Sequence, residues 1–300
     1  MANLKEIRSR ITSVKTTQQM TRAMKMVAAA KLRRAQDNIL RLRPYALKLQ
    51  EIMGDIRANM GDEFESPYGE VREPKSVLLV AVTSNRGLCG AFNNNIIKMV
   101  RAAIEGPYAE QYKAGNVQLL CIGKKVFEFY KRRDLEIYGG ENQDVFSGLS
   151  FEKVADVAET VMEGFVKGTW DRVDLIFNEF KNVVVQNVVR EQFLPISGED
   201  LSGAEGEGGH HNANYIFEPD QDQILADLIP KSLKTQFYKA VLESNAGEQG
   251  ARMTAMDNAT ENAAELLKDL RLKYNRARQA AITTEILEIV AGAEALASGA

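Results

Sequence analysis

The chain of 300 residues has few of the residue types on which most enzymes and metal proteins depend. It holds two histidines, His210 and His211, two cysteines, Cys89 and Cys121, and one tryptophan. Two cysteines are too few for a disulfide framework and indicate a reducing compartment. Adjacent histidines without a third ligand do not form a zinc site. Neither G-x-S-x-G nor H-E-x-x-H occurs. We therefore expect no catalytic residue, no metal and no cofactor.

Long apolar runs are also absent, since none approaches the ~20 residues that a membrane-spanning helix requires. Lys5 and Glu6 stand where a signal peptide would place the beginning of its apolar segment. These two features predict neither a membrane span nor a secretory signal.

Positive charge is concentrated at the start of the chain. Residues 1–60 hold five lysines and eight arginines against two aspartates and two glutamates, a net charge of +9. Because the whole chain carries −3, the remaining 240 residues carry −12. A basic segment of this kind indicates an acidic partner. Nucleic acid is one candidate, but the segment has a single aromatic residue, Tyr45, and an acidic protein loop fits at least as well.

Both ends of the chain predict long helices. From Leu4 to Met60, apolar or small residues recur at steps of three and four, and only Gln18, Thr21 and Lys25 interrupt them. A second such series comprises Met256, Ala259, Ala263, Leu266, Leu270, Tyr274, Ala277 and Ala281. This spacing is typical of a coiled coil. We expect the two ends to pair antiparallel, with Pro44 bending or ending the first helix and Pro230 beginning the last.

The middle of the chain predicts an α/β domain. Short β-branched strands alternate with amphipathic helices, and the last two strands have no helix between them. Such alternation gives a Rossmann-like, mostly parallel sheet, here with an antiparallel edge. The expected strands are 76–82, 117–122, 135–138, 173–180 and 186–193, and the expected helices are 91–104, 124–132 and 151–167. The expected segments are a coiled-coil helix at 1–60, the α/β domain at 75–195, a flexible acidic loop at 196–214, and a coiled-coil helix at 215–300.

The loop Ser84–Gly90 follows a strand and precedes a helix, where an α/β domain could bind phosphate. It lacks the G-x-G-x-x-G spacing, and Gly123-Lys124-Lys125 lacks the rest of a P-loop. A nucleotide- or sugar-phosphate-binding domain with coiled-coil arms therefore remains an alternative function, as does a basic scaffold for nucleic acid.

The end of the second helix is apolar on more than one face, at Ile282, Ile286, Leu287, Ile289, Val290 and Leu296. Each such side chain left in water forgoes about 1.5–3 kcal/mol. A helix of this kind is normally enclosed. Dimerisation or fraying of the helix tip is an alternative, and we favour an apolar sleeve that other chains supply.

Several stretches resemble the gamma subunit of F-type ATP synthases, and the match covers essentially the whole chain. They are KEIRSRI at 5–11, MKMVAAAK at 24–31, SNRGLCG at 84–90 with Asn93, ARMTAMDNAT at 251–260 and YNRARQAAIT at 274–283. The resemblance departs at Gly247 and Gly250, where alanine is common, and in the acidic loop 198–212. The cysteine-bearing insertion of plastid forms is absent, which argues against thiol control.

The resemblance implies a non-catalytic central rotor shaft that couples proton-driven rotation of the membrane ring to changes in the catalytic beta subunits. It implies the alpha–beta hexamer, the epsilon subunit and the c-ring as partners, no nucleic acid, and an indirect association with the cytoplasmic face of a bacterial inner membrane. The implied rotor–stator contacts are Lys25, Arg34, Ser84, Arg86, Arg252, Arg278, Gln279, Thr283 and Glu285. The implied sleeve tip is Ile286, Leu287, Ile289 and Val290, and the implied ring contacts are Tyr215 and Glu218.

Overall fold

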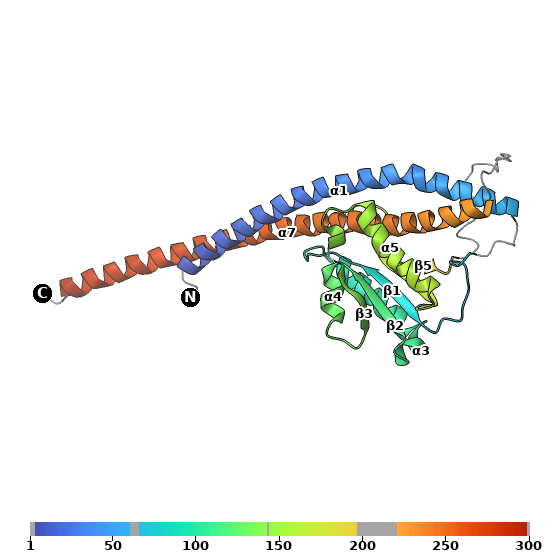
Figure 1. The fold of residues 1–300 in the computed structure, drawn as a ribbon. Coiled ribbons are helices and arrows are strands. Elements are labelled where there is room, and N and C mark those ends of the chain that lie inside the picture. Colours follow the sequence, from blue (N-terminus) through green and yellow to red (C-terminus); the bar gives the residue numbers. More distant parts are fainter. Residues whose placement is uncertain (1–3, 61–65, 143, 197–220, 299–300) are drawn as a thin grey trace. The chain divides into compact units, whose positions relative to one another are not determined.

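A computed structural model describes residues 4–60, 66–142, 144–196 and 221–298. The chain divides into two compact units, Met1–Ala28 with Met253–Ala300, and Ala29–Arg252. The two long helices, α1 and α7, each contribute to both units (Figure 1). The elements in order are α1 Leu4–Met60, β1 Val77–Val82, α2 Phe92–Glu105, α3 Ala109–Lys113, β2 Val117–Ile122, α4 Lys124–Tyr130, β3 Glu136–Asn142, η2 Asp144–Phe146, α5 Phe151–Val166, β4 Arg172–Phe180, β5 Gln186–Leu194 and α7 Gln221–Ser298.

Within the described residues, the unit 29–252 contains a five-stranded sheet in the order β3-β2-β1-β4-β5. Strands β3, β2, β1 and β4 are parallel, and β5 runs antiparallel to β4. The mostly parallel sheet with an antiparallel edge is thus confirmed. Strand β3 extends further than the expected 135–138, and its ladder with β2 is irregular between Leu120 and Ile122. Gly139 and Gly140, both at positive φ, supply the unusual backbone there.

Both faces of this sheet are buried, which explains the unbroken apolar sequence of β1. On one face, Leu78, Val80 and Val82 pack in a cluster with α5, with residues 225–241 of α7, and with Leu49 and Met53 of α1. On the other face, Val77, Leu79 and Ala81 pack with α2 and α4. The sheet is therefore the core on which this unit's parts of α1 and α7 are held.

Neither proline ends its helix. Helix α1 continues through Pro44, and α7 begins at Gln221 and continues through Pro230, so the helix start expected at Pro230 is wrong. A proline removes one backbone hydrogen bond from a helix. Leu225 and Ile229 before Pro230, and Leu233 after it, are buried in the same apolar cluster. Packing on both sides of the proline offsets the lost hydrogen bond.

The unit formed by 1–28 and 253–300 is a pair of antiparallel helices. Antiparallel pairing follows from two contacts, Thr21 with Thr260 and Lys25 with Asp257, in which one position rises as the other falls. Among the residues of this unit whose burial is described, the buried ones are Ile7, Thr21, Ala28, Met256, Ala263, Leu267 and Leu270. Leu267 thus replaces the expected Leu266, which is 43% exposed. An α-helix has 3.6 residues per turn, so a stripe on one face must mix steps of three and four residues. The expected series takes a step of three after Ala263, whereas the observed one takes a step of four.

Candidate functional site

The distal part of α7 exposes a continuous length of helix with large apolar side chains. Every residue from 282 to 290 is exposed. The fractions are 48% for Ile282, 54% for Ile286, 62% for Leu287, 70% for Ile289 and 48% for Val290. Steps of one, three and four residues place these side chains on more than one face of the helix. Within this chain, nothing described covers them, so this length of α7 is an unpartnered apolar surface.

Polar side chains lie just before and among these apolar ones. Arg278, Gln279, Thr283 and Glu285 are all exposed. The Thr283 hydroxyl donates a hydrogen bond to the Gln279 carbonyl at 2.9 Å. The side chains of Arg278, Gln279 and Glu285 are exposed to solvent. Glu285 also lines an open groove of about 1080 Å³ between the first turns of α1 and the distal part of α7.

A second group of predicted residues lies in the loop after β1. Ser84 is buried, and its hydroxyl donates to the Arg86 carbonyl at 2.6 Å. Asn93 of α2 accepts a hydrogen bond from the Ser84 amide at 3.0 Å and donates to its hydroxyl at 2.8 Å. Leu88 has a positive φ of 65° and is 64% exposed. Ser84 therefore shapes the loop from inside, whereas Arg86 and Leu88 face solvent.

Arg252 of α7 ties this loop to the long helix. Its guanidinium pairs with Glu248 one turn earlier, and its Nη2 donates to the carbonyls of Arg86 at 3.2 Å and Gly87 at 3.4 Å. A phosphate site would need free backbone amides at this position. The loop instead presents carbonyls to an arginine, which does not favour the nucleotide-binding alternative. Glu248 was missed from the sequence, although its spacing of four from Arg252 was a signal.

Both cysteines are buried. Cys89, inside the same loop, contacts Asn93 Nδ2 at 3.2 Å, and burial raises the pKa of its thiol. Burial raises the pKa of Cys121 to about 12. Both thiols are therefore protonated near neutral pH and poorly nucleophilic.

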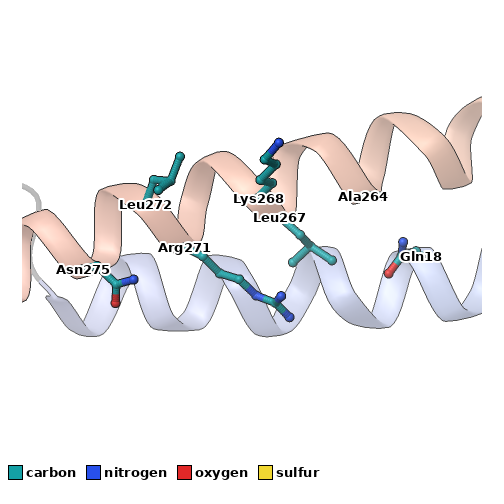
Figure 2. Close-up of a pocket in the computed structure, with 7 residues that line it drawn as sticks. All are labelled: Gln18, Ala264, Leu267, Lys268, Arg271, Leu272 and Asn275. Atoms are coloured by element: carbon teal, nitrogen blue, oxygen red, sulfur yellow. The ribbon is translucent and has the colours of Figure 1, made fainter.

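The three interruptions of the α1 stripe face α7. Lys25 Nζ lies 2.5 Å from Asp257 Oδ1, and the Thr21 and Thr260 hydroxyls are 2.7 Å apart. Gln18 lines a crevice of about 340 Å³ with Leu267, Arg271 and others of α7 (Figure 2). The ammonium group of Lys25 is thus paired within the chain. Arg34, another predicted contact, is exposed.

The remaining predicted residues lie outside the described ranges. Tyr215, Glu218 and both histidines fall within 197–220, as does nearly all of the expected acidic loop. Among the residues described, no group of three or more His, Cys, Asp or Glu side chains could hold a metal ion. Within these described ranges, no helix is long and apolar enough to cross a bilayer.

Comparison with known proteins gives matches over almost the whole chain. The ATP synthase family matches residues 3–296. The ATP synthase gamma chain of Cytophaga hutchinsonii is 55% identical over 299 residues, covering 99% of both chains. The gamma chain of Flavobacterium johnsoniae is 50% identical over 298 residues, again covering 99% of both.

Solved structures agree on the fold. A chain from the central stalk and c-ring structure of the Tetrahymena thermophila mitochondrial ATP synthase has a TM-score of 0.57 at 26% identity, covering 80% of this chain and 99% of that one. A chain from the rotor of the Euglena gracilis mitochondrial enzyme has a TM-score of 0.62 at 21% identity, covering 93% and 98%. With full-length relatives at about half identity, the chain belongs to the gamma chain family of the ATP synthases.

Proposed function

We propose that this chain is the central rotor shaft of an F-type ATP synthase. It couples proton-driven rotation of the membrane ring to conformational changes in the catalytic beta subunits, and in reverse it uses ATP hydrolysis to pump protons. It supplies no catalytic residue itself. Membership of the gamma chain family supports this function. The observation that carries it is the exposed apolar length of α7, which a protein acting alone would leave in water.

The sleeve for that apolar length is the ring of alternating alpha and beta subunits. Ile286, Leu287, Ile289 and Val290 are the residues it encloses. An apolar lining around an apolar helix holds the helix by burial without directional bonds. Such a contact allows the helix to turn in place, which a ring of ion pairs around the same residues would resist.

Coupling requires contacts that differ between rotational positions. A ligand or partner shifts a conformational equilibrium only by its differential interaction with the two states. Arg34, Arg86, Arg278, Gln279, Thr283 and Glu285 are exposed and can make such contacts with the alpha and beta subunits. Acidic loops of beta are suitable partners for the basic ones. Lys25 is paired with Asp257 but half-exposed, so its ammonium group can also interact with an acidic group of a partner subunit. Ser84 and Arg252 act indirectly, by holding the segment that bears Arg86.

The remaining assignments concern the other end of the shaft. Residues 1–60 and 215–300 supply the shaft, and residues 75–195 form the domain that binds epsilon. Residues 196–214 connect this domain to the second shaft segment. Tyr215 and Glu218 contact the c-ring. The chain is then a peripheral protein at the cytoplasmic face of the inner membrane, attached through the ring.

The sleeve is tested by the double substitution Ile286→Asp with Val290→Asp in the assembled enzyme. Two carboxylates placed in an apolar lining lose their hydration, so we expect weak retention of the chain by alpha and beta and a loss of ATP synthesis of at least about tenfold, as a difference of 1.4 kcal/mol gives. Co-purification of alpha and beta and ATP synthesis in inverted membrane vesicles are the readouts.

The matched control is Val71→Asp with Val184→Asp. It also places two carboxylates at exposed apolar positions, here two valines, but both lie on the unit 29–252 and away from the proposed sleeve contact. This control should assemble and synthesise ATP normally. Normal assembly and synthesis by the Ile286 and Val290 variant would refute the sleeve.

A further inference from the structure

The polar residues that interrupt the apolar stripe of α1 have no role in the function proposed above, apart from the charge of Lys25. Thr21 and Lys25 are one turn apart and lie on the same face of α1. Across from them, Asp257 and Thr260 lie on the same face of α7, and the contacts are direct at 2.5 Å and 2.7 Å. Two successive polar contacts in an otherwise apolar seam need a physical explanation.

The threonine pair links the two helix backbones. Each hydroxyl has one hydrogen to donate. The Thr260 hydroxyl lies 2.7 Å from the Met256 carbonyl, and the Thr21 hydroxyl lies 3.0 Å from the Gln18 carbonyl. One of the two hydroxyls can therefore donate to its own helix's carbonyl while the other donates across the seam, and either arrangement links the two helices. Thr21 is only 8% exposed.

The seam is packed differently on the two sides of these residues. Beside them, Ala28 and Met256 are 1% and 4% exposed. Toward the start of α1, Ile7 is the one buried residue between 4 and 20. The crevice at Gln18 (Figure 2) also lies on this side. So does the groove of about 1080 Å³. On this side most of the buried apolar residues belong to α7, namely Ala263, Leu267 and Leu270. The first turns of α1 therefore contribute little apolar burial of their own to the contact with α7.

We infer that Thr21, Lys25, Asp257 and Thr260 form a polar clasp that holds the first turns of α1 against α7. The clasp closes only when the helices are antiparallel, since Lys25 pairs with Asp257 and Thr21 with Thr260 in opposite order. These four are positioning residues, and they act inside one chain. The inference is independent of the proposed function, because any role of this helix pair requires the two helices to stay together.

Hydrogen exchange of the full-length chain tests the clasp, with mass spectrometry of the peptides that cover residues 4–20. The variants are Lys25→Asp, Asp257→Lys and the two together. Each single change places like charges opposite one another. The double change restores an opposite pair with an unchanged amino-acid composition. The control reverses two exposed residues, Lys31→Asp with Asp269→Lys, which form no ion pair with any part of the chain that the structure describes.

We expect each single change to accelerate exchange in residues 4–20 by about tenfold. This corresponds to a reduction of about 1.4 kcal/mol in the free energy of opening α1 from α7. The double change should return the rate to within about threefold of the parent, since two contacting residues are coupled. The control and the peptides of α5 should exchange at the parent rate.

Three results would overturn the clasp. The first is a parent-like rate in both single variants. The second is a double variant that exchanges as fast as the single ones, which shows that the two residues act separately. The third is acceleration that extends to α5, because the four residues would then support the whole fold. None of these results bears on assembly with alpha and beta, so the proposed function would stand.

Discussion

At the scale of single residues, Gly164 on α5 lies directly against the indole ring of Trp170. A methyl group at Gly164 would come within 2.0 Å of Trp170 Cζ3. The ring cannot easily move, because it is 1% exposed, donates from Nε1 to Gln118 Oε1 at 2.8 Å and packs edge-on against Tyr138 at 4.8 Å. The glycine is therefore required by the tryptophan.

Gly164→Ala should lower the free energy of unfolding by about 1–3 kcal/mol, the usual effect of overpacking. Gly247→Ala is the matched control, since its methyl group would meet Gln186 Cγ and Phe92 Cε2 at 3.4 Å, an ordinary contact. That variant should be neutral or more stable by up to about 1 kcal/mol, because alanine favours the helix. Urea titration followed by the fluorescence of the one tryptophan measures both. Equal stabilities of the two variants would contradict this account.

The sequence alone could predict which residues matter in some of these contacts, but not which residues they contact. The resemblance pointed to Ser84, Arg86 and Arg252, but the hydrogen bonds from Arg252 to the loop join positions about 165 residues apart. No spacing rule in a sequence reports such a contact. The polar breaks at Thr21 and Lys25 were visible in the sequence, whereas their partners on α7 required the antiparallel alignment of the two helices.

At the scale of elements, the loop after β1 depends on a helix far from it in the sequence. Arg252→Ala removes the two hydrogen bonds to the carbonyls of Arg86 and Gly87 and the ion pair with Glu248. The loop should open more often, and Cys89 should react with a maleimide about tenfold faster, as an opening free energy lowered by about 1.4 kcal/mol gives.

Cys121 serves as the internal control for that experiment. It lies in β2, is fully buried and has a pKa raised to about 12, so its reactivity should not change. Equal acceleration at both cysteines would indicate general unfolding, and an unchanged rate at Cys89 would show that Arg252 does not hold the loop.

Element types were predictable because their patterns are physical requirements. A strand buried on both faces must be apolar throughout, and β1 is. Element ends were less predictable. Pro230 favours a helix start in isolation, but burial of Leu225, Ile229 and Leu233 carries α7 through it. Likewise, Leu267 rather than Leu266 is buried. Both leucines fit the spacing of an apolar seam, and the difference between the 3.6-residue period of the helix and a 3.5-residue repeat decides which of them is buried.

At the scale of the whole molecule, two features of this chain require other chains. The apolar length of α7 is exposed on several faces, and positive charge is concentrated in residues 1–60. Neither contributes to a core within the described residues. An apolar helix and a basic surface on one shaft suit a partner with an apolar lining and acidic loops, as the proposed ring of alpha and beta subunits would supply.

The central claim is that this chain turns inside that ring, and direct observation of rotation tests it. A probe is attached to a cysteine replacing Lys113, an exposed residue of α3, in a complex whose alpha and beta subunits are fixed to a surface. The native cysteines are buried and should stay unlabelled. We predict that ATP drives the probe in one direction through repeated full turns. A probe that stays still while the same complex hydrolyses ATP would contradict the account.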